Sequence, residues 1–292
     1  MWPACRAGPG PHPPRGPAAA VGRRCPVSLI LRVFAAILLG ITLAGCATAK
    51  QKQQKAAVEQ RIDKIVKLNT ELAAAYLQRG QLDIAMQNIS KALALAPNDA
   101  GANNVMALLQ WQLKEHKEAD IYFNKALKAS PKDAIGRSKN SKVHNNYGAF
   151  LCEQGHVNKA VEQFRLALAD PLYATPAQAN LNAGLCLMKK PAPLDAEVYF
   201  RAALGLDPKL PDALYQMAKI SYDTGRTYSA RGFIQRYFEV GEDTPQSLLL
   251  AVKIEDALGY KDAEASYAVR LKGKFPGSSE AKRLQGLSLK RN

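Results

Sequence analysis

Two stretches of the sequence, "LAAAYLQRGQLDIAMQNISKALALAP" (72–97) and "MALLQWQLKEHKEADIYFNKALKASP" (106–131), share one pattern of small, apolar and proline residues. Ala85 aligns with Ala119, 34 residues later, and the same frame continues through four further copies. The recurring positions hold Ile89, Ala92, Pro97, Phe123, Ala126, Pro131, Gly148, Ala160, Phe164, Ala167, Gly184, Ala196, Phe200, Ala203, Pro208, Ala218, Ala230, Ile234, Ala251, Ala263 and Tyr267. A period held over six units predicts stacked copies of one supersecondary unit.

This pattern resembles the tetratricopeptide repeat, a helix–turn–helix of 34 residues. A small residue at position eight, such as Gly148 or Gly184, lets the first helix approach the second. A large apolar residue at position 24 fills the space beside it, and a proline at position 32 ends the second helix. We therefore expect an all-α solenoid of about six repeats over residues 66–276, and the resemblance implies a right-handed superhelix. The fixed period disfavours the alternative, a helical bundle whose small residues recur by chance.

The N-terminal part has the features of a secretory signal over residues 27–45. Arg23, Arg24 and Arg32 precede an uncharged run of twelve residues, 33–44. Twelve helical residues reach about 18 Å, which is short of the ~30 Å of a membrane core. A positive segment, a short apolar run and small residues before a cleavage point are typical of a signal peptide.

The run ends in "LAGC" (43–46), which resembles the lipobox of bacterial lipoproteins. The resemblance implies that the Cys46 thiol carries a diacylglycerol and that its amine, freed by cleavage, is acylated. Several acyl chains would hold the protein firmly on a membrane. Since Ala47 and not aspartate follows, the resemblance implies the periplasmic leaflet of the outer membrane. The alternative is an ordinary signal peptide with a chance cysteine.

The remaining segments are interpreted from composition. Residues 1–26 are rich in proline and contain no acidic residue, so we expect a disordered leader or an upstream extension of the true gene start. Residues 46–65 are predicted to be a lipidated N-terminus and polar linker, and 277–292 a C-terminal tail. The net charge is +15, but the basic residues are spread along the chain, so no nucleic-acid partner is expected.

Three stretches resemble the type IV pilus biogenesis and stability lipoproteins of the PilF/PilW type. They are "HNNYGAFLCEQG" (144–155), "ALADPLYATPAQANLNAGLC" (167–186) and "FPGSSEAKRL" (275–284). The resemblance extends over nearly all of the chain after Cys46. It implies a pilotin, an adaptor without enzymatic activity that binds the pilus secretin subunit and promotes its localisation, multimerisation and pilus biogenesis. The open alternatives are a repeat lipoprotein of outer-membrane β-barrel assembly and a scaffold for peptidoglycan enzymes.

A repeat solenoid presents its first helices as a concave groove, which is the expected partner-binding surface. The positions that usually face it are mostly apolar, aromatic or amide residues, which suit an apolar peptide segment or an amphipathic helix. An acidic tail would suit it less, because a carboxylate clamp needs several lysines or arginines. The predicted groove residues are Asn104, Leu108, Trp111, Asn145, Ala149, Leu181, Leu185, Met188, Tyr215, Lys219 and Tyr222.

Cys152 and Cys186 fall on the first helices of adjacent repeats. Such helices pack about 8–10 Å apart, so the two cysteines can form a disulfide in an oxidising compartment; two buried free thiols are the alternative. His144 and His156 flank Cys152, but their spacing does not match a zinc site, so no metal is expected. No catalytic motif is present, and no cofactor or small-molecule substrate is expected.

Overall fold

The structure is a computed structural model that describes residues 27–132, 140–190 and 193–289. Residues 27–50 and 285–289 are described by their backbone only, and the predicted leader 1–26 lies outside the described residues. The chain divides into two compact units, residues 1–61 and 62–292, which are described separately.

The described residues form helices and no β-strand, which confirms the predicted all-α fold. The helices are α1 (Val27–Gln78), α2 (Leu82–Leu95), α3 (Ala100–Gln112), α4 (His116–Ala129), α5 (Ser141–Glu153), α6 (Val157–Leu168), α7 (Pro176–Leu187), α8 (Pro193–Leu206), α9 (Pro211–Asp223), α10 (Thr227–Val240), α11 (Pro245–Leu258), α12 (Lys261–Lys274) and α13 (Ser279–Leu289).

Helix α1 runs through both the predicted signal segment 27–45 and the predicted linker 46–65. Its C-terminal part belongs to the second unit, where Ile62 and Val66 pack into the first core cluster of the repeats. The helical repeat region therefore begins about one turn before the predicted boundary at residue 66. Among the described residues, no helix is both long enough and apolar enough to cross a membrane.

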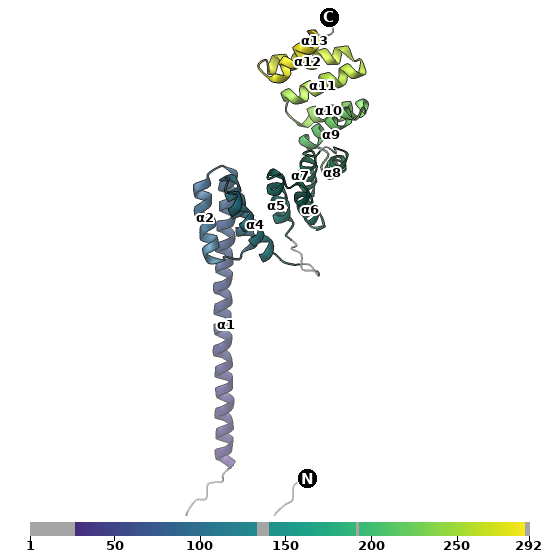
Figure 1. The fold of residues 1–292 in the computed structure, drawn as a ribbon. Helices are drawn as coiled ribbons and strands as arrows, with labels where there is room; N and C mark the ends of the chain where they lie inside the picture. The colour runs from purple at the N-terminus through teal and green to yellow at the C-terminus, as the bar shows by residue number, and fades with distance from the viewer. Residues whose placement is uncertain (1–26, 133–139, 191–192, 290–292) are drawn as a thin grey trace, which may run out of the picture. The chain divides into compact units, whose positions relative to one another are not determined.

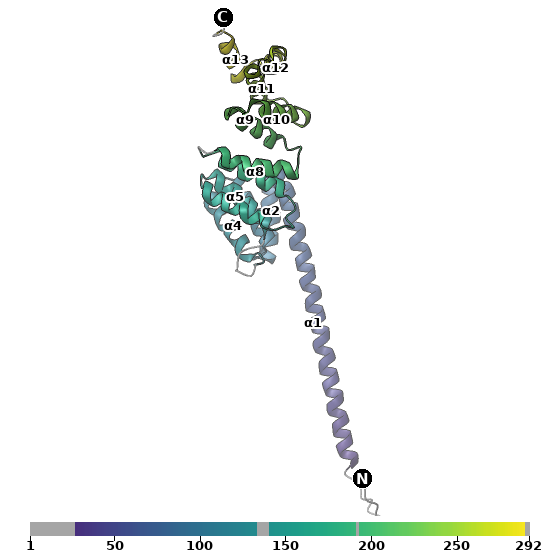
Figure 2. The same ribbon diagram turned by 90° about the vertical axis from the view of Figure 1, so that its right-hand side faces the viewer.

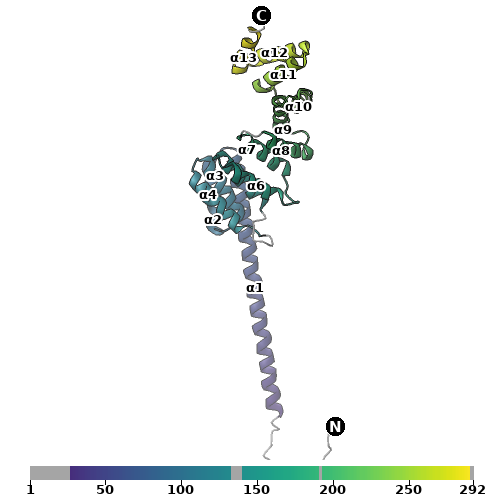
Figure 3. The ribbon, with the colours of Figure 1, turned by 45° about the vertical axis from the view of Figure 1, so that its right-hand side comes forward.

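The second unit is a series of helical hairpins in the predicted order. Helices α3 and α4 pair, as do α5 and α6, α7 and α8, α9 and α10, and α11 and α12. Figure 1 and Figure 2 show α9 to α13 as successive hairpins, and Figure 3 shows α2, α3 and α4 side by side. The segment predicted as a C-terminal tail contains α13, which packs on α11 and α12.

Three successive hairpins, α3–α4, α5–α6 and α7–α8, each close over a large buried side chain. Phe123, Phe164 and Phe200 stand at position 24 of successive repeats and are fully buried. A Cβ atom on Gly184 would lie only 2.6 Å from Cε1 of Phe200, and one on Gly148 would lie 2.8 Å from Cε1 of Phe164. Glycine is required at these two positions because the ring occupies the space that a side chain would need.

A left-handed residue stands in the turn of five hairpins within the described residues. Gly80, Gly155 and Gly225, which the sequence places at these turns, have φ angles of 73°, 80° and 75°. Gly259 takes the same role in the sixth repeat, whereas Lys114 does so in the second with a φ of 66°. A lysine there carries the strain that glycine avoids, about 1–2 kcal/mol.

Buried carboxylates connect helices of neighbouring repeats. Glu197 on α8 accepts hydrogen bonds of 2.8 and 2.6 Å from Arg226 at the start of α10, and one of 2.9 Å from Arg201. Glu255 on α11 accepts bonds of 2.9 and 3.0 Å from Arg231 on α10. The Arg226 hydrogen bonds lower the pKa of Glu197 from 4.5 to about 2, with Arg201 adding to the effect against the opposing effect of burial.

Replacing Gly184 with alanine should destabilise the protein, because the added methyl group would overlap the Phe200 ring. The matched control is Gly232→Ala in α10, where nothing lies within 4 Å of the new Cβ. Both changes gain the same helix propensity, so the difference between their unfolding free energies isolates the overlap, about 1–3 kcal/mol. Urea denaturation measures this difference, and equal midpoints for the two variants would contradict the close-packing argument.

Acid should weaken the protein partly through Glu197. Since its pKa is lower in the folded state, its ion pairs stabilise fully above the ordinary value of 4.5 and are lost as the pH falls towards about 2. Glu197→Gln should therefore be less stable than wild type near neutral pH and should lose less stability between these two pH values. Glu162→Gln, which removes an exposed partner of Arg165, is the control and should follow wild type. Parallel acid losses in wild type and Glu197→Gln would refute the assignment.

Candidate partner-binding groove

Helices α3, α5, α7 and α9 carry the predicted groove residues, and their exposure differs. The partly exposed ones are Leu108, Trp111, Ala149, Met188, Tyr215, Lys219 and Tyr222. Leu185 is exposed, at 36% of its surface. These side chains leave an apolar and aromatic surface on the first helices of the repeats.

Leu181 does not contribute to this surface. Only 3% of it is exposed, and it belongs to the core cluster that also contains Phe200 and Leu214. The prediction that Leu181 faces a partner is therefore wrong. Its side chain packs in the middle of α7 with residues of its own and the following repeat, where an apolar side chain is best buried.

Two asparagine pairs cross the junctions between the first helices. Nδ2 of Asn146 donates to Oδ1 of Asn104 over 3.2 Å, which connects α5 to α3. Nδ2 of Asn182 donates to Oδ1 of Asn145 over 3.1 Å, which connects α7 to α5. The predicted residues Asn104 and Asn145 are buried, whereas their partners remain partly exposed.

Asn146 and Asn182 are functional candidates that the sequence analysis missed. The doubled amides in "HNN" (144–146) and "NLN" (180–182) were the available signal. Asn145 and Leu181 hold the predicted groove positions in these two stretches. The partly exposed amides are the residues that follow them, Asn146 and Asn182. A partly exposed amide supplies both a donor and an acceptor, which suits the backbone of a bound peptide.

An aromatic contact positions Trp111 at the edge of this surface. Its ring meets the buried Phe150 ring edge-on, with 5.8 Å between centroids. The ring is thus held by packing on one side while part of it stays exposed. Half-buried, fixed aromatic rings are suited to anchor a partner, because little side-chain entropy is lost on binding.

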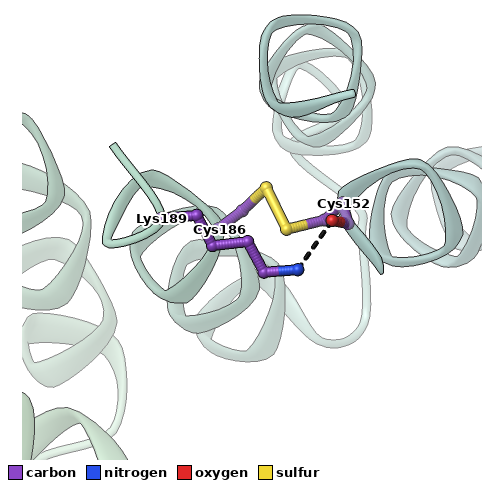
Figure 4. The surroundings of a disulfide bond; sticks show 3 residues. All are labelled: Cys152, Cys186 and Lys189. Carbon is purple, nitrogen blue, oxygen red and sulfur yellow. Dashed lines mark hydrogen bonds between the residues drawn. A yellow bond between two sulfur atoms is a disulfide. The ribbon is translucent and has the colours of Figure 1, made fainter. Parts of the chain in front are cut away.

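A disulfide joins the two cysteines of the groove helices. Cys152 on α5 and Cys186 on α7 are bonded, with Cα atoms 5.7 Å apart, and both are buried (Figure 4). Nζ of Lys189 also donates to the backbone oxygen of Cys152 over 2.7 Å. The third and fourth repeats are therefore fastened together at the same junction that the Asn145–Asn182 pair crosses.

The connection before α7 is also tied down, at the "DPLY" stretch (170–173). Oδ2 of Asp170 accepts a 2.9 Å hydrogen bond from the Ser141 hydroxyl at the start of α5, and Oδ1 accepts one of 2.9 Å from the Leu172 amide. This explains why an aspartate stands at the end of the third repeat. It fixes the entry of α7 relative to α5.

The C-terminal end of the groove forms a pocket of about 200 Å³ between α9, α11 and α13. Three predicted residues, Tyr215, Lys219 and Tyr222, line it. Burial raises the pKa values of both tyrosine hydroxyls above their usual 10. The residues that the sequence analysis missed here are Asp223, Gln246, Leu249, Leu250, Lys253, Glu280 and Arg283.

The remaining predicted sites lie elsewhere. Cys46 falls within α1, in the stretch described by its backbone only. His144 lies near Cys152 in the sequence but was not expected to bind a metal. Its Nδ1 atom is hydrogen-bonded to Oε1 of Gln163 over 2.7 Å. Across the described residues, no group of three or more His, Cys, Asp or Glu side chains is placed to hold a metal ion.

The model of the tetratricopeptide repeat family matches residues 70–134 and 151–211. Both stretches lie in the hairpin series, so the match and the geometry agree on the architecture.

Similar proteins share this architecture over most of the chain. The chain is 30% identical to the type IV pilus assembly protein PilF of Pseudomonas aeruginosa, over 88% of this chain and 99% of that protein. A solved structure of P. aeruginosa PilF is similar with a TM-score of 0.71 and 31% identity, covering 77% of this chain and 98% of the other. A crystal structure of PilW, described as a widely conserved type IV pilus biogenesis factor, gives a TM-score of 0.66 and 31% identity, covering 76% and 98%.

Removing the disulfide should loosen the middle of the repeat series. The bond closes a loop over a sequence separation of 34 residues, which corresponds to about 3–4 kcal/mol of stabilisation in the chain-entropy account. The double variant Cys152→Ala with Cys186→Ala should therefore unfold at lower urea concentration than wild type. A reducing agent should lower the wild-type midpoint and leave that of the variant unchanged. A wild-type midpoint that does not respond to reduction would contradict this prediction.

Proposed function

We propose a function for this chain on the premise that it belongs to the PilF/PilW family of type IV pilus biogenesis proteins with tetratricopeptide repeats. The protein acts as a pilotin: it binds the pilus secretin subunit and promotes its localisation and multimerisation. It works as an adaptor, by binding and not by catalysis. Its partner is a protein, and no nucleic acid or small-molecule substrate takes part.

The observation that carries this proposal is the character of the groove. Partly exposed apolar and aromatic side chains such as Trp111 and Met188 lie on the same series of first helices as the partly exposed amides of Asn146 and Asn182. Apolar anchors next to amides suit a peptide segment, which presents both side chains and backbone groups. The disulfide and the asparagine pairs hold the helices in place before the partner arrives, which lowers the entropic cost of binding.

The second part of the proposal concerns location. Cys46 carries a diacylglycerol and an N-acyl chain, and these hold the protein on the periplasmic leaflet of the outer membrane. The "LAGC" stretch (43–46) and the basic, apolar and small segments before it support this part. Anchoring places the groove where a secretin subunit must be delivered.

The test is a deletion of the gene in its own bacterium, complemented with wild type or with Cys46→Ala. Deletion should remove secretin multimers from outer-membrane fractions while porin levels stay constant. Wild type should restore the multimers. Cys46→Ala should yield a folded protein in the soluble periplasmic fraction and fewer multimers in the outer membrane, since the repeat region does not depend on the lipid for folding.

Each alternative has its own signature in the same experiment. Loss of porins together with secretin would indicate an adaptor of β-barrel assembly, and altered peptidoglycan with intact secretin multimers would indicate a scaffold for peptidoglycan enzymes. Either result would overturn the pilotin proposal. Cys46→Ala protein that stays in the membrane fraction would overturn the lipid anchor alone.

A further inference from the structure

Helix α13 completes a binding pocket at the end of the groove. Ala281 and Leu284 of α13 are buried in a cluster with Leu248, Leu249 and Val252 of α11. This packing fixes α13 beside α11 and brings Arg283 and Glu280 to the pocket that Tyr215 and Tyr222 of α9 also line. The pocket is therefore lined by α9 and α11, the first helices of the fifth and sixth repeats, and by α13, which follows the last repeat.

One cation in this pocket, Lys253, has no carboxylate partner within 4.0 Å among the described residues, whereas the charge of Arg283 helps to lower the pKa of Glu280, three residues earlier on α13. Lys219 pairs with Asp223 over 2.8 Å, and Glu280 accepts a 2.9 Å hydrogen bond from the Ser279 hydroxyl. Within the same part of the chain, Arg283 also forms no ion pair within 4.0 Å. With three cations and two carboxylates on its lining, the pocket has a net positive charge that attracts an anion.

The other lining groups suit the same kind of ligand. The Tyr215 and Tyr222 hydroxyls are protonated at neutral pH, as their usual pKa of 10 already requires and as burial, which raises the pKa further, reinforces, so they can donate hydrogen bonds. Gln246 adds an amide, and Leu249 and Leu250 add an apolar wall. A carboxylate can accept hydrogen bonds from donors of these kinds, and charge-assisted hydrogen bonds are strong.

The size of the pocket restricts the ligand further. Its volume of about 200 Å³ is smaller than the ~300–1,000 Å³ of pockets that enclose drug-sized molecules. It has room for one acidic side chain, or for the carboxylate at a chain end, and not for a cofactor. The pocket also continues the predicted groove, since three groove residues line it.

We propose that this pocket, between α9, α11 and α13, binds a carboxylate of the partner peptide, with Lys253 and Arg283 as the residues that recognise it. The inference rests on the proposed function and adds the chemistry of one contact. An acidic residue of the secretin segment enters the pocket, while the apolar and amide surface on α3, α5 and α7 holds the rest of the segment. This proposal departs, at the C-terminal end of the groove, from the sequence-based expectation that an acidic tail would suit the groove less well.

The test uses the full-length protein in detergent and overlapping peptides that cover the secretin of the same bacterium. Peptides that bind are resynthesised with each Asp or Glu replaced by Asn or Gln, and affinities are measured by fluorescence anisotropy at low and high salt. The variants are Lys253→Gln and Arg283→Gln, separately and together. Lys282→Gln is the matched control, because it removes the same charge from an exposed neighbour on α13 that does not line the pocket.

The expected result is a loss of affinity of about tenfold or more for the double variant, which corresponds to two charged contacts at a partly exposed site. The Asp or Glu replacement should weaken wild-type binding by a similar factor and should not weaken the double variant further. Lys282→Gln should bind as wild type does, and salt should reduce wild-type affinity. Circular dichroism should show unchanged melting for all variants, since these side chains carry no ion pair.

Two results would overturn the inference in different ways. Peptide binding that is equal in wild type, the double variant and Lys282→Gln, or that ignores the acidic residue, would refute the carboxylate pocket and leave the proposed function standing. If the wild-type protein neither binds any secretin peptide nor co-purifies with intact secretin, both the carboxylate pocket and the proposed function are refuted.

Discussion

The close approach of the two helices in each hairpin is the constraint on which the rest of the structure depends. At Gly184 and Gly148 the first helix leaves no space for a side chain, and the Phe200 and Phe164 rings fill that space. Because the rings are fully buried, the distance between the two helices is set by a rigid group. Each hairpin thus becomes a unit of fixed thickness, and stacking such units brings the first helices together on one surface.

Polar contacts then fix each unit to the next, and they differ between the two sides of the stack. The second helices are joined by ion pairs such as Glu197 with Arg226. The first helices are joined by asparagine pairs and, between α5 and α7, by the Cys152–Cys186 disulfide. Groove residues therefore lie on a framework that is already ordered, and a binding surface of this kind loses little entropy when a partner docks.

The groove changes character along its length. The α3, α5 and α7 part offers Trp111, Met188 and exposed amides, whereas the α9, α11 and α13 part offers tyrosine hydroxyls and cations. A single apolar groove would bind many apolar segments. In the function proposed here, a groove with an apolar part and a positively charged end would instead select segments that have an acidic residue at the matching distance from their apolar residues.

The sequence by itself determined the repeat, the helical class, the turn glycines and the two cysteines that pair, because a fixed period forces equivalent residues into equivalent local environments. Exposure along each first helix was decided only by the tertiary structure. Leu181 fits the groove frame but is buried, and Asn146 falls outside the frame but is exposed. Arg283 could not be placed from the sequence, because its segment has no partner helix in the repeat pattern. It reaches the groove only because Ala281 and Leu284 bury themselves on α11, a contact between segments that the period does not encode.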